Sequence, residues 1–263
     1  MKRSLLAGVS IAALISVANA ADLPRKAPIM APAALPVLSW TGCYVGGNVG
    51  GGWGKNDVTQ TATAPGSSLA PAFSGRATTG VDTSGAVFGG QIGCDYQFAN
   101  RFVIGIQGML DGTSIDGTEA DAFAGLLPGA PIGSIGVKTK WLGSVTGRLG
   151  YSFLQQNEAL LYVKGGGAWA RYETNLNNLT TNIVFPGSNP GTIDKTFNGW
   201  TVGAGFEYRF ARNWSAFIEY NYYDFGEKTI WSGAGGGLTS NTISLDPKIQ
   251  TVTVGVNYRF WTP

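Results

Sequence analysis

The stretch 251–260, near the end of the printed sequence, alternates strictly between two kinds of side chain. One set is apolar or aromatic: Val252, Val254, Val256, Tyr258 and Phe260. The other set is small, polar or charged: Thr251, Thr253, Gly255, Asn257 and Arg259. A period of two residues predicts a β-strand with one face in an apolar medium and the other in a polar medium. A charged face does not suit the dry core of a soluble barrel, so the pattern favours a membrane-spanning strand.

The first 20 residues have the parts of a secretory signal peptide. Lys2 and Arg3 give a positive start, residues 5–17 are mostly apolar, and residues 18–20 form a small-x-small cleavage site. We predict cleavage between Ala20 and Ala21, which leaves 243 residues (263 − 20) and lowers the formal charge from +2 to 0. The apolar run is too short for a spanning helix, so an uncleaved anchor is the less favoured alternative. A neutral mature chain argues against nucleic acid as a partner.

Composition bounds the rest of the chain. Residues 21–39 carry four prolines and no periodic pattern, which predicts an extended periplasmic leader. After the signal peptide no segment reaches 18 consecutive apolar residues, so the length rule excludes a helical membrane protein. The 40 glycines and the 13% of charged residues suit an all-β chain. We therefore expect one barrel domain over residues 40–263.

Eight segments show the alternating pattern, and the connections between them predict their arrangement. The segments are residues 40–54, 84–98, 102–111, 137–151, 160–171, 196–210, 213–226 and 251–260. Short connections at 99–101, 152–159 and 211–212 alternate with long ones at 55–83, 112–136, 172–195 and 227–248. Short turns that alternate with long loops are typical of a bacterial outer-membrane barrel. We predict a closed, up-and-down, eight-stranded antiparallel transmembrane β-barrel, with both termini and the short turns periplasmic and the long loops extracellular.

Aromatic residues are expected to form two girdles around this barrel. The short-turn girdle comprises Tyr96, Phe98, Phe102, Tyr151, Phe153, Tyr208, Phe210, Trp214, Tyr258, Phe260 and Trp261. The long-loop girdle comprises Trp53, Trp141, Trp169, Trp200 and Tyr222. The alternative, a β-sandwich with these rings in its core, leaves their clustering at element ends unexplained.

Several motifs resemble one known family. They are WTGCYVGGN at 40–48, GRLGY at 147–151, GWTVGAGFEY at 199–208 and EYNYYDFG at 219–226. Together they resemble the small alpha-proteobacterial outer-membrane barrels called outer-membrane immunogenic or porin-family proteins, within the OmpA-like eight-stranded superfamily. Thr253, Gly255, Tyr258 and Phe260 also resemble the C-terminal assembly signal of bacterial outer-membrane barrels. The resemblance implies an integral outer-membrane protein with antigenic surface loops, whose partners are outer-membrane lipid, lipopolysaccharide and the outer-membrane assembly machinery.

The polar faces of the strands predict what fills the barrel. They would carry four acids, Asp95, Asp111, Glu207 and Glu219, and four bases, Arg148, Lys164, Arg209 and Arg259. Charges away from bulk water persist when they are paired and hydrogen-bonded, so we predict a lumen plugged by ion pairs. The alternative is a narrow water path that opens when the pairs rearrange.

The cysteines form a candidate pair. Cys43 and Cys94 would lie near the periplasmic ends of the first two strands. Antiparallel neighbours place such residues opposite each other on the outward face, and the periplasm is oxidising. The resemblance implies an aromatic residue at both positions in many relatives, so the joint change to cysteine favours a Cys43–Cys94 disulfide over two free lipid-facing thiols.

Catalytic chemistry has little support in the sequence. The chain has no histidine, which removes the usual general base and the usual metal ligand. Asp116, Glu119 and Asp121 could form a cation site, but a solvated loop is the favoured interpretation. We predict no catalytic residue, no cofactor and no metal site. The function predicted is a structural outer-membrane surface protein, with a small solute pore or a loop-mediated adhesin as the alternatives.

Overall fold

The computed structural model describes residues 38–63, 75–121, 133–178, 191–235 and 238–260. All of these residues belong to one compact unit, within residues 36–263. The predicted signal peptide, its cleavage position after Ala20, and the leader up to residue 37 lie outside the described residues. Within the described ranges no helix has the length and apolarity needed to cross a membrane.

The described residues form one antiparallel sheet of ten strands. The strands are β1 (Gly42–Thr63), β2 (Gly75–Gln97), β3 (Phe102–Thr113), β4 (Asp116–Ala120), β5 (Ser134–Phe153), β6 (Ala159–Asn178), β7 (Thr192–Arg209), β8 (Trp214–Asp224), β9 (Lys228–Gly235) and β10 (Leu238–Arg259).

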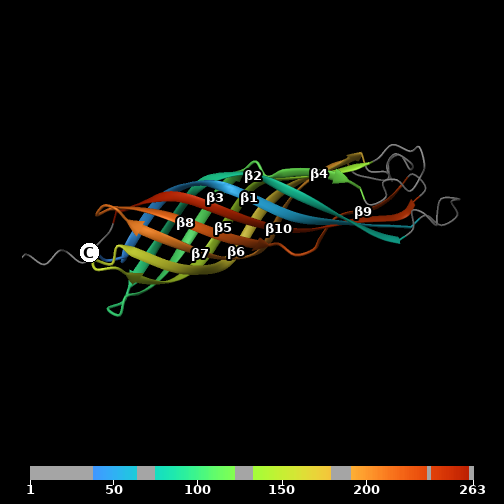
Figure 1. Ribbon diagram of the computed structural model, residues 1–263. Coiled ribbons are helices and arrows are strands. Elements are labelled where there is room, and N and C mark those ends of the chain that lie inside the picture. Colours follow the sequence, from blue (N-terminus) through green and yellow to red (C-terminus); the bar gives the residue numbers. More distant parts are fainter. Residues whose placement is uncertain (1–37, 64–74, 122–132, 179–190, 236–237, 261–263) are drawn as a thin grey trace, which may run out of the picture. The chain divides into compact units, whose positions relative to one another are not determined.

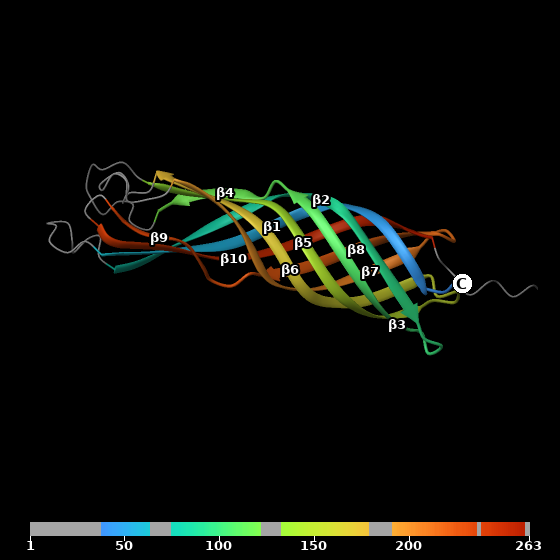
Figure 2. The same cartoon turned by 180° about the vertical axis from the view of Figure 1, so that it is seen from behind.

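Eight of these strands close into a ring, in the order β1-β2-β3-β5-β6-β7-β8-β10. The ring is completed by β10 and β1, which pair from Tyr44↔Arg259 to Thr63↔Ser240. Figures 1 and 2 show this wall from two opposite sides. Closure gives both edges of every ring strand a neighbour, which a sheet in lipid requires. The predicted eight-stranded up-and-down barrel is confirmed.

The strands continue beyond their predicted ends, and β4 and β9 were not predicted. β4 lies between β2 and β5, beyond the end of β3, and β9 continues the course of β8 beside β10. The four long connections were predicted to be loops throughout, and this prediction is wrong at both ends of each one. For example, β1 runs on to Thr63 and β2 begins at Gly75, so both include much of the connection 55–83.

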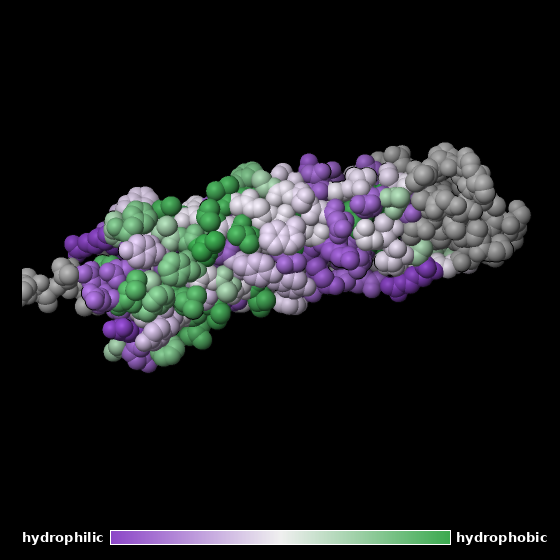
Figure 3. All heavy atoms as spheres, in the orientation of Figure 1, coloured by the Kyte–Doolittle hydropathy of each residue, from purple (hydrophilic) through white to green (hydrophobic). Residues whose placement is uncertain are grey.

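The lower wall, between the two aromatic girdles, is apolar outside and polar inside. Outward-facing Val254, Ile104 and Ile92 are 48%, 45% and 60% exposed, while inward-facing Asn257 and Glu207 are buried. In Figure 3 the apolar side chains gather over the end that carries β7 and β8, and hydrophilic side chains gather toward β9. The lower wall therefore has the sidedness predicted for a barrel in lipid.

The upper wall, beyond Trp53, has the opposite sidedness. On β1 the same alternate residues point inward, but they are now Val58 and Ala62, while Lys55 and Thr61 are exposed. The buried apolar residues of this region form one cluster, called here the upper core. It comprises Val58, Val81, Val87, Met109, Ile115, Ile135, Val137, Leu142, Ala168, Ala170, Tyr172, Leu176, Phe197, Tyr223, Phe225, Ile230, Ile243, Leu245 and Ile249. The outer faces of the strand ends beyond Trp53 are polar, so in sequence these strand ends look like loops.

Most girdle aromatics lie outward, as predicted. Trp53, Trp169 and Trp200 are exposed at the long-connection side, whereas Trp141 and Tyr222 are half-buried. At the short-turn side the rings meet edge-on or tilted in pairs across and along the strands: Tyr96–Phe98, Phe102–Tyr151, Phe153–Phe206 and Trp214–Tyr258. Trp261 lies outside the described residues.

Candidate functional site

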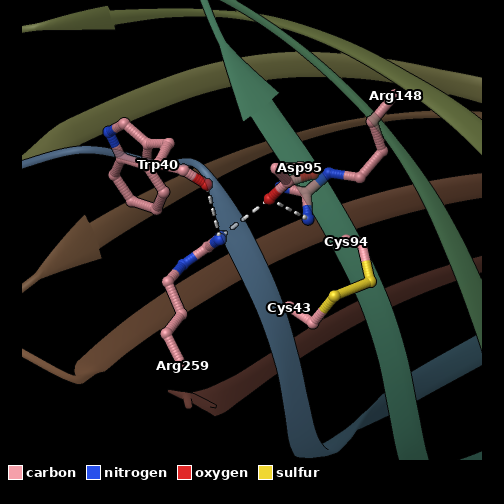
Figure 4. Close-up of a disulfide and its surroundings, with 6 residues drawn as sticks. All are labelled: Trp40, Cys43, Cys94, Asp95, Arg148 and Arg259. Carbon is pink, nitrogen blue, oxygen red and sulfur yellow. Dashed lines mark hydrogen bonds and ion pairs between the residues drawn. A yellow bond between two sulfur atoms is a disulfide. The ribbon is translucent and has the colours of Figure 1, made fainter. Parts of the chain in front are cut away.

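Four charged side chains from four strands meet inside the lower wall. Arg259 Nη2 lies 2.8 Å from Asp95 Oδ2, and Arg148 Nη2 lies 2.9 Å from Glu207 Oε2. Cross-contacts of 3.7 Å, from Arg148 to Asp95, and 3.5 Å, from Arg259 to Glu207, join both pairs into one network. Figure 4 shows both guanidinium groups turned toward Asp95. All four side chains are at most 2% exposed, so the charges are compensated by one another and not by bulk water.

Neutral groups complete this network. Ser215 Oγ and Asn257 Nδ2 donate to Glu207 Oε1 over 2.6 and 2.9 Å. Arg148 also donates to the Tyr44 hydroxyl, and its guanidinium lies 4.0 Å from the centre of the Tyr162 ring. These contacts hold Arg148 in place, so the network is a fixed structural element.

A second ion pair lies in the wall beside the first network. Lys164 Nζ is 2.6 Å from Glu219 Oε1, and both side chains are fully buried. Glu219 also accepts hydrogen bonds from the Tyr162 hydroxyl and from Asn221 Nδ2, over 2.8 and 2.9 Å. Gly205 faces Tyr162, and a Cβ there would overlap the phenol ring. Glycine at position 205 therefore makes room for the Tyr162 side chain to lie along the inner wall.

The other two predicted lumen charges have no ion pair among the described residues. Asp111 is buried on β3 and accepts a hydrogen bond from Asn48 Nδ2 over 2.9 Å. Arg209 is buried at the end of β7, where it donates to the carbonyl of Ser39 over 2.6 Å and lies 5.2 Å from the Trp40 ring centre. Six of the eight predicted residues are thus in ion pairs, and these two lie at the upper and lower ends of the polar region.

Trp40 closes the lower end of the lumen, whereas the sequence analysis placed it only at the start of the first strand and of a family motif. It is fully buried, with its indole N–H donating to the Asn157 carbonyl over 2.8 Å and its own carbonyl accepting from Arg259 Nη1 over 3.0 Å. Its backbone N–H donates to Gln97 Oε1 over 2.7 Å. The ring also packs with Val103 and Leu160. The available signal was a tryptophan that directly follows the proline-rich leader; β1 begins two residues later, at Gly42.

The interior therefore contains three successive layers. Trp40 and its neighbours fill the short-turn end, the ion pairs fill the middle, and the upper core fills the part beyond Trp53. Eight strands leave an interior just wide enough for side chains to fill. This packing opposes a continuous water path.

The structure contains the Cys43–Cys94 disulfide, which confirms that prediction. Cys43 and Cys94 are direct cross-strand partners on β1 and β2, with Cα atoms 4.0 Å apart. Figure 4 shows the bridge between the two ribbons, on the opposite side from the Asp95 carboxylate. The bridge fixes the register of β1 and β2 from the outside of the barrel.

An exposed charge cluster lies on the outer face of the upper wall. Arg171 Nε and Lys140 Nζ approach Asp194 to 2.7 and 3.3 Å, and Lys140 is also 2.6 Å from Glu173. The hydrogen bonds from Arg171, followed by those from Lys140, hold the pKa of the Asp194 carboxyl below its usual range. This cluster joins β5, β6 and β7.

The three acids considered for a cation site do not gather. Asp116 and Glu119 are exposed on β4, whereas Asp121 is buried and its backbone N–H donates to the Gly133 carbonyl over 3.0 Å. Across the residues that the structure describes, no group of three His, Cys, Asp or Glu side chains could hold a metal ion.

Comparison with known proteins identifies the family. The family model described as outer membrane protein beta-barrel domain matches residues 10–260 of this chain. The chain belongs to this family. It is 33% identical over 269 residues to the 31 kDa outer-membrane immunogenic protein of Brucella melitensis, which covers 99% of this chain and 100% of the relative. It is 25% identical to the 25 kDa outer-membrane immunogenic protein of Brucella abortus, with 99% of each chain covered.

The outer membrane protein OprG of Pseudomonas aeruginosa aligns at 14% identity with a TM-score of 0.49, covering 87% of this chain and all of that one. The barrel family and the full-length relatives place this protein in the outer membrane of a Gram-negative cell, as an integral β-barrel.

Proposed function

We propose that this protein is a structural surface barrel that conducts no solutes and catalyses no reaction. The observation that carries the proposal is that side chains fill the interior formed by the described strands in three layers: Trp40 below, buried ion pairs in the middle and the upper core above. A pore would need a continuous wet path between polar walls, and the upper core interrupts such a path with apolar side chains.

Current recording in planar lipid bilayers tests the sealed lumen. The refolded mature protein is expected to give no steady conductance. Steady current steps that Arg148→Ala abolishes or alters would favour the solute pore instead. Arg76→Ala is the matched control, because Arg76 is exposed near the start of β2 and far along the strand from the ion-pair network.

We further propose that the long-connection end faces outward and is the antigenic surface. Support comes from relatives named as outer-membrane immunogenic proteins and from the even number of ring strands, which returns both chain ends to one side. Replacing residues 64–74 with a short Gly-Ser linker should reduce the binding of antisera, raised against cells that carry the wild-type protein, to intact cells that carry the variant. The change leaves β1 and β2 whole, and unchanged recognition would count against that connection as an epitope.

The same proposal covers targeting and assembly. Cleavage after Ala20 would leave Ala21 as the first residue of a periplasmic leader, which N-terminal sequencing of the purified protein tests. Packing alone requires glycine at position 255, because a Cβ there would overlap the Gly47 carbonyl and the Phe217 ring. Tyr258 and Phe260, both outward, would present the terminal aromatic residues to the assembly machinery. Phe260→Ala should lower the amount of assembled protein in the outer membrane. Lipopolysaccharide would surround the barrel at the level of the long-loop girdle.

The non-enzymatic part of the proposal rests on what the lumen acids already bind. Glu207 and Glu219 each accept several hydrogen bonds and take part in an ion pair, which leaves neither available as a general base.

The alternative function, loop-mediated adhesion, would use the same outward end. It is tested by comparing how well cells that carry the wild-type protein and cells that carry the variant lacking residues 64–74 bind to host-cell layers.

A further inference from the structure

The Cys43–Cys94 bridge lies on the lipid-facing side of the lower wall. Cys94 is exposed and Cys43 is half-buried on the outer face of β2 and β1, away from the lumen ion pairs, as Figure 4 shows for Asp95. The outward neighbours of the bridge are all apolar or aromatic and 50% to 60% exposed: Val45, Ile92, Tyr96, Ile106 and Phe260. In the outer membrane such side chains face lipid, so the bridge lies within the apolar band, and the girdle residue Tyr96 separates it from the short turn after β2.

A bridge in this position is closed to redox chemistry once the wall is in the membrane. Thiols and disulfides exchange when a thiolate attacks a sulfur atom, so the reaction needs an ionised group. An unpaired ion is strongly disfavoured in an apolar medium, and soluble oxidoreductases act from the water phase. Lipid around Cys43 and Cys94 therefore prevents both the formation and the exchange of their bridge.

Few side chains of β1 fix its register against β2. Seven of the 13 residues from 42 to 54 are glycine. Strand register depends on the pattern of side chains and is weakly specified in glycine-rich strands, where a slip of one residue exchanges the two faces. Such a slip would turn Tyr44, which accepts a hydrogen bond from Arg148 in the lumen, outward to the lipid. A covalent link at Cys43↔Cys94 holds the two strands in the native register.

We propose that a periplasmic thiol oxidase joins Cys43 and Cys94 before the barrel enters the membrane, and that the bridge presets the register in which β1 and β2 assemble. An outer-membrane chain crosses the periplasm, which is oxidising, whichever end of the barrel later faces outward. The thiolate of one cysteine attacks the disulfide of the oxidase and forms a mixed disulfide. The thiolate of the other then attacks the chain's own sulfur in that mixed disulfide, so the Cys43–Cys94 bond forms and the oxidase leaves as a dithiol. Two electrons and two protons pass to the oxidase.

Glutathione tests whether lipid closes the bridge. The mature protein, with its bridge intact, is folded into lipid nanodiscs, which leave both ends of the barrel open to solution. Reduced glutathione is then added, and free thiols are counted by alkylation and mass spectrometry. The matched control carries the changes Cys43→Ser, Cys94→Ser, Lys55→Cys and Asp82→Cys. Lys55 and Asp82 are cross-strand partners on the same two strands and the same outer face, but they are exposed beyond Trp53, in water.

The two bridges should be reduced at widely different rates. In nanodiscs the Cys43–Cys94 bridge should be reduced about 100-fold more slowly than the bridge of the control, because its sulfur atoms meet a thiolate only when the wall opens locally. In urea, where both chains are unfolded, the two bridges should be reduced at similar rates. Equal rates in nanodiscs would overturn the proposal, because the bridge would then be open to oxidation after insertion.

An offset pair of cysteines tests whether the bridge forms first and sets the register. Ile92 lies two residues before Cys94 on the same face of β2, and its partner in the folded barrel is Val45. In the variant Cys94→Ser, Ile92→Cys, the two cysteines of the folded barrel are diagonal neighbours about 7–8 Å apart, beyond the usual reach of a disulfide. A bridge made before assembly would instead hold β1 and β2 two residues out of register. Cells with the thiol oxidase should therefore contain severalfold less folded barrel of this variant than cells without it.

Two comparisons complete this test, with the folded barrel measured by heat-modifiable gel migration. The wild type should show the opposite dependence, with more folded barrel in cells that have the oxidase. The single-cysteine variant Cys43→Ser, Cys94→Ser, Ile92→Cys cannot form a bridge within the chain, so it corrects both results for any other effect of the oxidase. After that correction, equal amounts of the offset variant in the two strains, or equal amounts of the wild type, would overturn the preset register.

Discussion

Replacing Arg148 by methionine should destabilise the barrel more than any other single change in the lumen that keeps side-chain size. Arg148 lies 2.9 Å from Glu207 and 3.7 Å from Asp95, and its side chain is 2% exposed. Without it, one cation, Arg259, remains for two carboxylates in this network. Breaking a buried ion pair by removing one partner costs about 3–5 kcal/mol, because the remaining charge is left uncompensated. We expect a loss in that range from Arg148→Met.

A second substitution should recover most of the loss. In the double variant Arg148→Met, Glu207→Gln, both charges are gone and Asp95 keeps Arg259 at 2.8 Å. The glutamine oxygen can still accept from Ser215 and Asn257. Replacing a whole buried pair by neutral groups of similar volume is often close to neutral, so the double variant should lie within about 1 kcal/mol of the wild type.

Urea unfolding in phospholipid vesicles measures these differences, with the folded fraction taken from heat-modifiable gel migration. The midpoint and slope give the free energy of unfolding for each variant. Arg76→Met controls for the loss of a surface arginine and should change the free energy by less than about 0.5 kcal/mol. If Arg148→Met costs less than about 1 kcal/mol, or if the double variant is no more stable than the single one, the lumen charges are not a coupled, desolvated network.

Three further predictions concern other parts of the barrel. Trp40→Ala should cost about 3–5 kcal/mol of unfolding free energy, as for other buried tryptophans, and Trp40→Phe markedly less; equal losses would show that the ring does not pack as a plug. Replacing both Cys43 and Cys94 by serine should lower the free energy of unfolding by about 4 kcal/mol, the loop-closure value for a bridge between residues 51 apart. The double variant should unfold at the same midpoint as the reduced wild type, and a midpoint equal to that of the oxidised wild type would contradict the prediction. The pKa of Asp194 is lowered in the folded state, so its contribution to stability is present above the ordinary aspartate range and is lost as the pH falls through the lowered pKa. Asp194→Asn should remove that part of the pH dependence, and an identical pH profile would contradict it.

The lower wall could be predicted from sequence because two media constrain it at once. Alternate residues such as Val254 and Asn257 must satisfy lipid outside and a polar lumen inside, and this gives a strong period of two. The pairing of Cys43 with Cys94 could be predicted because both residues fall near the periplasmic ends of two neighbouring antiparallel strands, where such residues lie opposite each other. The charged residues of the lumen were found for the same reason.

The upper wall could not be predicted as readily, because its outer face is in water. Thr61 and Lys55 are ordinary loop residues by composition, and the inward Val58 and Ala62 are too sparse to stand out. The choice of partner for each lumen charge also depends on side-chain rotamers and on the position of each strand around the ring. The alternating sequence pattern contains neither kind of information. Asp111 and Arg209 each match the inward pattern and still form no ion pair among the described residues.

The extension of β1 beyond Trp53 has a consequence for anything that approaches the cell from outside. Ten residues separate Trp53 from Thr63, and at roughly 3.3 Å per residue and a tilt of about 40° they rise roughly 25 Å above the girdle. With the long-connection end outward, as proposed, this part of the wall is a stiff extension of that height beyond the girdle, filled with its own apolar core. An antibody or a host receptor could then contact the polar outer faces of the described strands, such as Lys55 and Thr61 on β1, without reaching down to the girdle.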